Sequence, residues 1–182
     1  MSILGIDPGM GATGYAVLEK TPAGLVLKKS GEIRTVPKDP FPDRLKHLFD
    51  RLQQVIEEDP PSAIAIEDTF LAKNFKSALK LGQARGVALL TAAFHRLPVY
   101  EYTPTEVKMA VVGFGQASKD QIQQMVCRLL RLPVIPASEH AADAAAVGIC
   151  HAHSIQFREK IAAGLLIKGA AKGARNGTSH ER

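Results

Sequence analysis

Residues Ser2-Ile3-Leu4-Gly5-Ile6-Asp7-Pro8-Gly9-Met10-Gly11-Ala12-Thr13-Gly14-Tyr15-Ala16-Val17 place one acid, Asp7, in an apolar strand and follow it with a glycine-rich turn. A carboxylate in such a strand must be desolvated, paired or bound to a metal, because burying an unpaired charge is costly and the group would otherwise be protonated. This stretch therefore predicts two antiparallel strands joined by a turn, and it makes Asp7 the first candidate metal ligand.

Two other interpretations of the stretch remain. The pattern Gly9-x-Gly11-x-x-Gly14 matches a dinucleotide-binding fingerprint, but that motif requires a helix to open within the glycines, whereas residues 14–18 are rich in strand-forming side chains. Asp7 could also do no more than shape the turn, which is the usual role of an isolated Asp-Pro-Gly sequence. Only acids elsewhere in the chain can favour a metal site over that simpler role.

The length of 182 residues fits one domain with a substantial core. It argues against the actin-like and sugar-kinase ATPases, which share an Asp-x-Gly turn but hold nucleotide between two domains. The sequence contains no long apolar run, and it begins with a strand instead of a signal segment, so we expect a cytosolic protein. Cys127 and Cys150 lack metal-ligand spacing and are interpreted as buried, reduced thiols.

Positive charge is concentrated in two parts of the chain, whose overall net charge is +5. Residues 69–119 carry seven basic and two acidic side chains, and residues 160–182 carry five basic and one acidic. Either run can be a solvated face, but together they also fit an anionic partner such as nucleic acid. Residues 158–182 are rich in Gly and Ala as well as basic, and we expect this tail to be disordered from about Gly169.

Periodicity predicts an α/β domain over residues 1–157, with three antiparallel strands, then two parallel strands, and helices flanking the sheet. Capping boxes at Thr103 and Ser118 predict two helix starts, and Ser138 is a candidate cap for a last helix. The expected strands are 2–7, 13–19, 25–36 (interrupted near Gly31), 62–67 and 97–102, and the expected helices are 44–57, 74–96, one from 103 to the break at Gly113, 118–131 and 139–153.

Further acids lie at the ends of other predicted elements. Glu67 ends the strand 62–67, and His140 and Asp143 are three residues apart, so they share one face of the last helix. Ligands of open sheets gather beyond the strand ends, where these elements can converge with Asp7. Carboxylates held together repel, and two Mg²⁺ ions would relieve that repulsion while activating water and stabilising a leaving oxygen at a phosphodiester.

Together with the segments around them, these candidate ligands resemble a known family, the RuvC crossover junction endodeoxyribonucleases, which have a ribonuclease H-like fold. The resemblance runs from Ile3 to about His153. It is carried by Gly5-Ile6-Asp7-Pro8-Gly9, Ile66-Glu67, Phe70-Leu71-Ala72-Lys73-Asn74, Ser77-Ala78-Leu79-Lys80-Leu81-Gly82-Gln83-Ala84-Arg85-Gly86, Val107-Lys108, Val111-Val112-Gly113 and Ala141-Ala142-Asp143-Ala144.

This resemblance implies a homodimer that binds a four-way Holliday junction and nicks two opposed strands symmetrically, in cooperation with the RuvA and RuvB branch-migration proteins. It implies that Asp7, Glu67 and Asp143 are metal ligands. Lys108 and Lys119 would contact scissile-strand phosphates or support catalysis, and Phe70 would stack on bases or wedge between them. The candidate DNA-binding residues are Phe70, Lys73, Asn74, Lys76, Lys80, Arg85, Lys108 and Lys119.

His140 departs from the family pattern, because the commoner sequence is Asp-Ala-Ala-Asp and this chain has His140-Ala141-Ala142-Asp143. We expect His140 to be a metal ligand and a catalytic residue, with Glu139 as the competing oxygen donor. An imidazole nitrogen suits Mn²⁺ better than Mg²⁺, so the sequence predicts relatively strong activity with Mn²⁺.

Two other functions stay open. The loss of a carboxylate at His140 would suit a catalytically silent junction-binding protein. A related ribonuclease H-like enzyme acting on structured RNA is the second alternative, although the match over residues 70–86 weighs against it.

Overall fold

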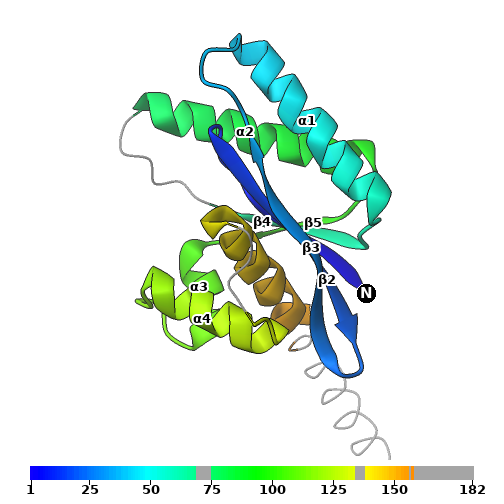
Figure 1. Cartoon of the computed structure of the whole chain (residues 1–182), viewed down its shortest axis with the longest axis vertical. Helices are drawn as coiled ribbons and strands as arrows, with labels where there is room; N and C mark the ends of the chain where they lie inside the picture. The colour runs from blue at the N-terminus through cyan, green and yellow to red at the C-terminus, as the bar shows by residue number, and fades with distance from the viewer. Residues whose placement is uncertain (69–74, 134–137, 156, 158–182) are drawn as a thin grey trace, which may run out of the picture.

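The protein, seen here as a computed structural model, is described over residues 1–68, 75–133, 138–155 and 157. Its five strands form one sheet in the order β3-β2-β1-β4-β5 (Figure 1). β1 pairs antiparallel with β2 and parallel with β4, so the predicted mixed sheet is confirmed. The strands are β1 (Ser2–Asp7), β2 (Ala12–Thr21), β3 (Gly24–Arg34), β4 (Ala63–Glu67) and β5 (Val99–Tyr102).

Helices cover both faces of this sheet (Figure 1). On one face, α1 (Phe41–Glu58) and α2 (Phe75–Phe94) close an apolar cluster with β1 and β4. On the other face, α3 (Pro104–Val112), α4 (Lys119–Leu130) and the final helix (residues 139–155) close a second cluster rich in alanine. The final helix therefore packs on the face to which Asp7 points.

The predicted capping boxes are present at Thr103 and Ser118, where each cap side chain accepts a backbone N–H and a Glu or Gln side chain bonds back. The predicted first residue of α1 was wrong. The helix begins at Phe41, before the predicted Arg44, because Pro42 lies in the first turn, where a missing N–H costs no hydrogen bond.

The predicted interruption of the third strand near Gly31 was also wrong. β3 is continuous, and its register shift lies between the pairs Val17–Lys29 and Leu18–Leu27. Gly31 has a different role, because a Cβ there would lie 2.7 Å from the hydroxyl of Tyr15. The glycine thus lets the Tyr15 ring lie across the neighbouring strand.

Two glycines bring the final helix into backbone contact with the sheet. A Cβ on Gly5 would lie 2.1 Å from the carbonyl oxygen of Ala144, and one on Gly14 would lie 1.9 Å from that of His140. The sequence suggested that the glycines after Asp7 only form the turn, which is wrong for Gly14. This residue lies inside β2 and seats the first turn of the helix that carries His140.

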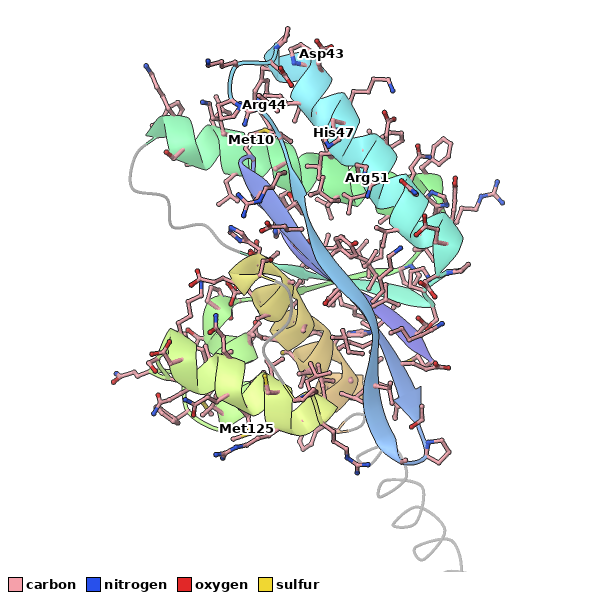
Figure 2. The ribbon with its side chains drawn as sticks, in the orientation of Figure 1. Met10, Asp43, Arg44, His47, Arg51 and Met125 are labelled. Atoms are coloured by element: carbon pink, nitrogen blue, oxygen red, sulfur yellow. The ribbon has the colours of Figure 1, made fainter. Side chains whose placement is uncertain are left out.

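The turn after Asp7 is held by a buried arginine. Arg44 donates hydrogen bonds to the Met10 carbonyl at 3.0 Å and to Thr35 Oγ1 at 2.9 and 3.0 Å, and Figure 2 shows Arg44 beside Met10. Thr13 and Gly9 close the base of the same turn through Thr13 Oγ1. The chain that follows Asp7 is therefore fixed from α1 and from the end of β3.

One face of α2 is exposed although it is apolar. Phe75, Leu79 and Leu90 are 83%, 54% and 61% exposed, and a Cβ on Gly82 or Gly86 would meet nothing within 4 Å. Helical spacing puts these residues on the side opposite the buried Ala84 and Ala88. Across the described part of the chain, no helix has the length and apolar character needed to cross a membrane.

Candidate metal centre

Asp7, His140 and Asp143 form one group whose candidate ligand atoms lie within 4.8 Å of one another. Asp7 is the last residue of β1, whereas His140 and Asp143 are one turn apart at the start of the final helix. His140 Nδ1 lies 3.0 Å from Asp7 Oδ2. The contact at Gly14 sets this geometry, because it presses the backbone of His140 onto β2, next to the end of β1.

The electrostatics of the group favour a cation. Burial raises the pKa of the Asp143 carboxyl, nearby Asp7 raises it further, and Lys119 opposes both effects. The hydrogen bond to Asp7 raises the pKa of His140. Asp7 and Asp143 thus favour a positive charge at His140, and a bound metal ion would supply one. The two carboxylate oxygens and one imidazole nitrogen are a donor set that suits a divalent cation.

Glu139 does not face this group. Its side chain is 72% exposed and its Oε2 lies 2.9 Å from Lys119 Nζ. Lys119 also reaches Asp143 Oδ2 at 3.4 Å, and these contacts, first the one with Glu139, raise the pKa of the lysine. The structure therefore brings His140 to Asp7 and Asp143, and it pairs Glu139 with the predicted phosphate contact Lys119.

Glu67 and Lys108 are also neighbours of Asp143. Together with Asp143 they line a cavity of about 50 Å³ between β4, α3, α4 and the final helix. Within the described ranges, Glu67 is not a member of the tight group around Asp7. Among the described acids, Asp143 belongs both to the group with Asp7 and His140 and to the lining of the cavity with Glu67.

Apart from Lys108 and Lys119, which lie near Asp143, the predicted DNA-binding residues separate into three groups. Phe70, Lys73 and Asn74 lie outside the described residues, and Lys76 and Lys80 are exposed on α2. Arg85 is engaged within the protein, because it lies 3.1 Å from Asp68 Oδ1 and also pairs with Glu101. Since Asp68 directly follows Glu67, Arg85 fixes the end of β4 as well as carrying positive charge.

Glu32 is a charged neighbour of the centre that the sequence did not reveal. It lies on β3 opposite Gly14, and its pKa is lowered by Arg34 first, then by the Ser138 hydroxyl and by His140. Ser138 itself caps the final helix, as predicted, by accepting the Ala141 N–H at 3.1 Å. The signal that could have found Glu32 is the exact pairing of β2 with β3, which periodicity alone does not supply.

Comparison with known proteins assigns this fold to a family. The family model for the crossover junction endodeoxyribonuclease RuvC matches residues 3–151. The chain belongs to the RuvC family. It is 52% identical over 154 residues to the RuvC of Citrifermentans bemidjiense, covering 85% of this chain and 93% of that protein. It is 47% identical over 161 residues to the RuvC of Pelotomaculum thermopropionicum, covering 88% and 98%.

Solved structures agree with this family. The Thermus thermophilus RuvC in complex with a Holliday junction substrate superposes with a TM-score of 0.82 at 33% identity, covering 86% of this chain and 96% of that one. The yeast mitochondrial Holliday junction resolvase matches with a TM-score of 0.56 at 13% identity, covering 86% and 83%, which shows a shared fold. This RuvC-family chain therefore has the ribonuclease H-like fold that its sequence predicted.

Proposed function

We propose that this RuvC-family chain is a structure-selective endonuclease that resolves four-way DNA junctions in recombination and repair. The observation that carries the proposal is the convergence of Asp7, His140 and Asp143 within 4.8 Å, on elements far apart in the sequence. Neighbouring Lys119 adds a positive charge beside Asp143. Acids for a divalent cation and amines for a phosphate are the two requirements of phosphodiester hydrolysis.

A bound divalent cation would supply the chemistry of activating water and stabilising the leaving oxygen. The chain itself would hold and orient the reacting groups. Asp7, His140, Asp143 and Glu67 would be the metal ligands. Lys119 and Lys108 would attract and position the scissile phosphate, and Lys119 would exchange its contact with Glu139 for the substrate.

Two Mg²⁺ ions per site are the preferred form of this proposal. Asp143 belongs both to the group with His140 and to the cavity lined by Glu67, which supports two neighbouring positions. Mn²⁺ would be accepted as well, and His140 favours it because imidazole is a better ligand for Mn²⁺ than for Mg²⁺. Asp7 and His140 would bind one position together, which requires their mutual hydrogen bond to open.

A homodimer that nicks two opposed strands symmetrically is the second part of the proposal. A four-way junction has near two-fold symmetry, which a two-fold enzyme matches. The exposed apolar face of α2, with Leu79 and Leu90 flanking Gly82 and Gly86, supports a self-complementary contact between two copies. Burying this face against its own copy would remove it from water.

The proposal also covers the DNA contacts, the partner proteins and the division of the chain. Lys76 and Lys80, with Phe70, Lys73 and Asn74, would contact the junction, and Arg85 would contribute charge while paired with Asp68. The protein would act in the cytosol with the RuvA and RuvB branch-migration proteins. Residues 1–157 would form the nuclease domain, and residues 158–182 a basic tail.

Nicking of a mobile four-way junction, mapped on all strands with Mg²⁺ and with Mn²⁺, tests the activity. The wild-type protein should cut two opposed strands, and Asp7→Asn should bind the junction without cutting it. Persistent metal-dependent nicking by Asp7→Asn would refute the site. Wild-type binding without cutting in either metal would identify a silent junction-binding protein, and displacement of the junction by structured RNA would favour an RNA-processing nuclease.

A further inference from the structure

A row of three paired residues crosses the sheet beside the metal centre. Asp7 on β1 lies opposite Gly14 on β2, and Gly14 lies opposite Glu32 on β3. Residues directly opposite each other in antiparallel strands point to the same face of the sheet. Asp7 and Glu32 therefore both point toward the final helix, and the glycine between them has no side chain.

His140 occupies the space above that glycine. A Cβ on Gly14 would lie 1.9 Å from the His140 carbonyl oxygen and 3.0 Å from its Cβ. The His140 side chain thus begins between the two acids of the row. Its Nδ1 bonds Asp7 Oδ2 at 3.0 Å, so the ring turns this nitrogen toward the metal ligands and leaves Nε2 as its second polar position.

Glu32 supplies a carboxylate on the same face of the sheet, across Gly14 from Asp7. Its Oε1 accepts a hydrogen bond from Arg34, which holds the carboxylate in place. Its Oε2 is buried and makes no hydrogen bond within the described residues, although the Ser138 hydroxyl lies close enough to lower the pKa of the carboxyl. A buried carboxylate oxygen without a donor is costly, so a nearby donor should form part of the working state of the site.

We infer that Glu32 is a positioning residue for His140, accepting a hydrogen bond from the imidazole Nε2–H so that Nδ1 is held toward the metal. The inference rests on the proposed function, because it describes how the same centre is completed. Metal-ligating histidines generally donate their second ring N–H to a carboxylate or carbonyl, which fixes the tautomer and the ring orientation. Here β3 supplies the carboxylate, across the gap that Gly14 leaves.

Mn²⁺ binding to the DNA-free protein, measured by calorimetry or by electron paramagnetic resonance, tests this role without requiring catalysis. Glu32→Ala should weaken Mn²⁺ binding about tenfold, the low end of the loss found when such supporting groups are removed. Glu32→Gln keeps an acceptor oxygen and should lose less. Glu19→Ala is the matched control, because it removes one exposed acid from the far end of β2 and should leave Mn²⁺ binding unchanged.

A second comparison separates positioning of His140 from a general effect of charge or stability. In a His140→Asp background there is no imidazole to orient, so adding Glu32→Ala should cause no further loss of Mn²⁺ affinity. The ¹⁵N resonances of the His140 ring provide an independent readout. With diamagnetic Mg²⁺ bound in place of Mn²⁺, they should report one tautomer, protonated at Nε2, in the wild type and a mixture of tautomers in Glu32→Ala.

The outcomes distinguish this inference from the proposed function. A wild-type protein that neither binds Mn²⁺ nor nicks junctions would refute the proposed function, and the inference with it. A wild-type protein that does both, with Glu32→Ala binding Mn²⁺ equally well and showing the same His140 ring spectrum, would overturn the inference alone. An equal loss in the wild-type and His140→Asp backgrounds would also overturn it, because the effect would then not pass through His140.

Discussion

His140 Nδ1 lies 3.0 Å from Asp7 Oδ2, so the first turn of the last helix is joined to the last residue of the first strand. The two residues are 133 positions apart, and the contact closes the sheet and the helix around one charged site. Because Glu139 points away to Lys119, the site has one imidazole where a second helix carboxylate would otherwise lie.

His140→Ala should reduce nicking at least about tenfold and should abolish the preference for Mn²⁺, because a ligand and its nitrogen donor are both lost. Glu139→Ala should have a much smaller effect on metal dependence, since that side chain is exposed and contacts Lys119. The measurement is the nicking rate over a range of Mg²⁺ and Mn²⁺ concentrations. The reverse ranking of the two variants would exclude His140 as the fourth ligand.

The stability of the metal-free protein should fall as pH rises above about 6.5, the ordinary pKa of histidine. The folded-state pKa values of His140 and Asp143 are both raised, so the folded protein binds more protons than the unfolded chain. Stability from such groups is complete below their unfolded pKa values and is lost as pH rises through the folded values.

Urea unfolding with chelator at about pH 6 and about pH 8 measures this loss, with the higher value chosen to lie beyond the ordinary range of histidine. His140→Gln should show a flatter dependence, because it removes the side chain whose pKa is raised from the ordinary histidine value of 6.5. Added Mn²⁺ should restore stability at the higher pH, where the ligands are deprotonated. A metal-free protein whose stability rises over this interval would contradict the assigned direction.

Gly14→Ala should destabilise the protein by about 1–3 kcal/mol, the usual cost of overpacking. The new Cβ would meet the His140 backbone, so the variant should also lose metal affinity as the helix shifts. Gly11→Ala is the control, because a Cβ there would meet nothing within 4 Å. Thermal unfolding and Mn²⁺ titration should distinguish the two variants. Equal stability and equal Mn²⁺ affinity of both would show that the final helix is not seated on Gly14.

Arg85 and Lys80 are both basic residues of α2, but replacing them should affect different properties: DNA binding for Lys80, and stability and nicking for Arg85. Lys80→Ala should weaken junction binding and lower the slope of log affinity against log salt by about one, as expected for a single phosphate contact. Arg85→Ala should mainly lower stability and nicking, because it frees Asp68 beside Glu67. Binding measured over a salt series, together with unfolding curves, checks both. A larger change in salt slope for Arg85→Ala would make it primarily a DNA contact.

Leu79→Glu should convert the proposed dimer to a monomer, because it puts a charge into the exposed apolar face of α2. Analytical ultracentrifugation measures the change, and the monomer should lose paired nicking of opposed strands. Val26→Glu is the control, since Val26 is also exposed, at 46%, but lies on β3. A Leu79→Glu protein that stays dimeric would place the dimer contact elsewhere.

The sequence by itself determined the elements and most of the candidate ligands. The alternation around Asp7, the capping boxes at Thr103 and Ser118, and the three-residue spacing of His140 and Asp143 are local patterns, and local backbone chemistry is enough to read them. These patterns also sufficed for the mixed sheet and for the family resemblance that the comparisons confirm.

Only the tertiary structure decided which side chains meet. That His140 faces Asp7 while Glu139 faces Lys119 depends on how the final helix is rotated, and Gly14 sets that rotation through a backbone contact. The approach of Glu32 to the same centre depends on the register of β2 with β3. Such contacts join residues distant in the chain, so no local periodicity encodes them.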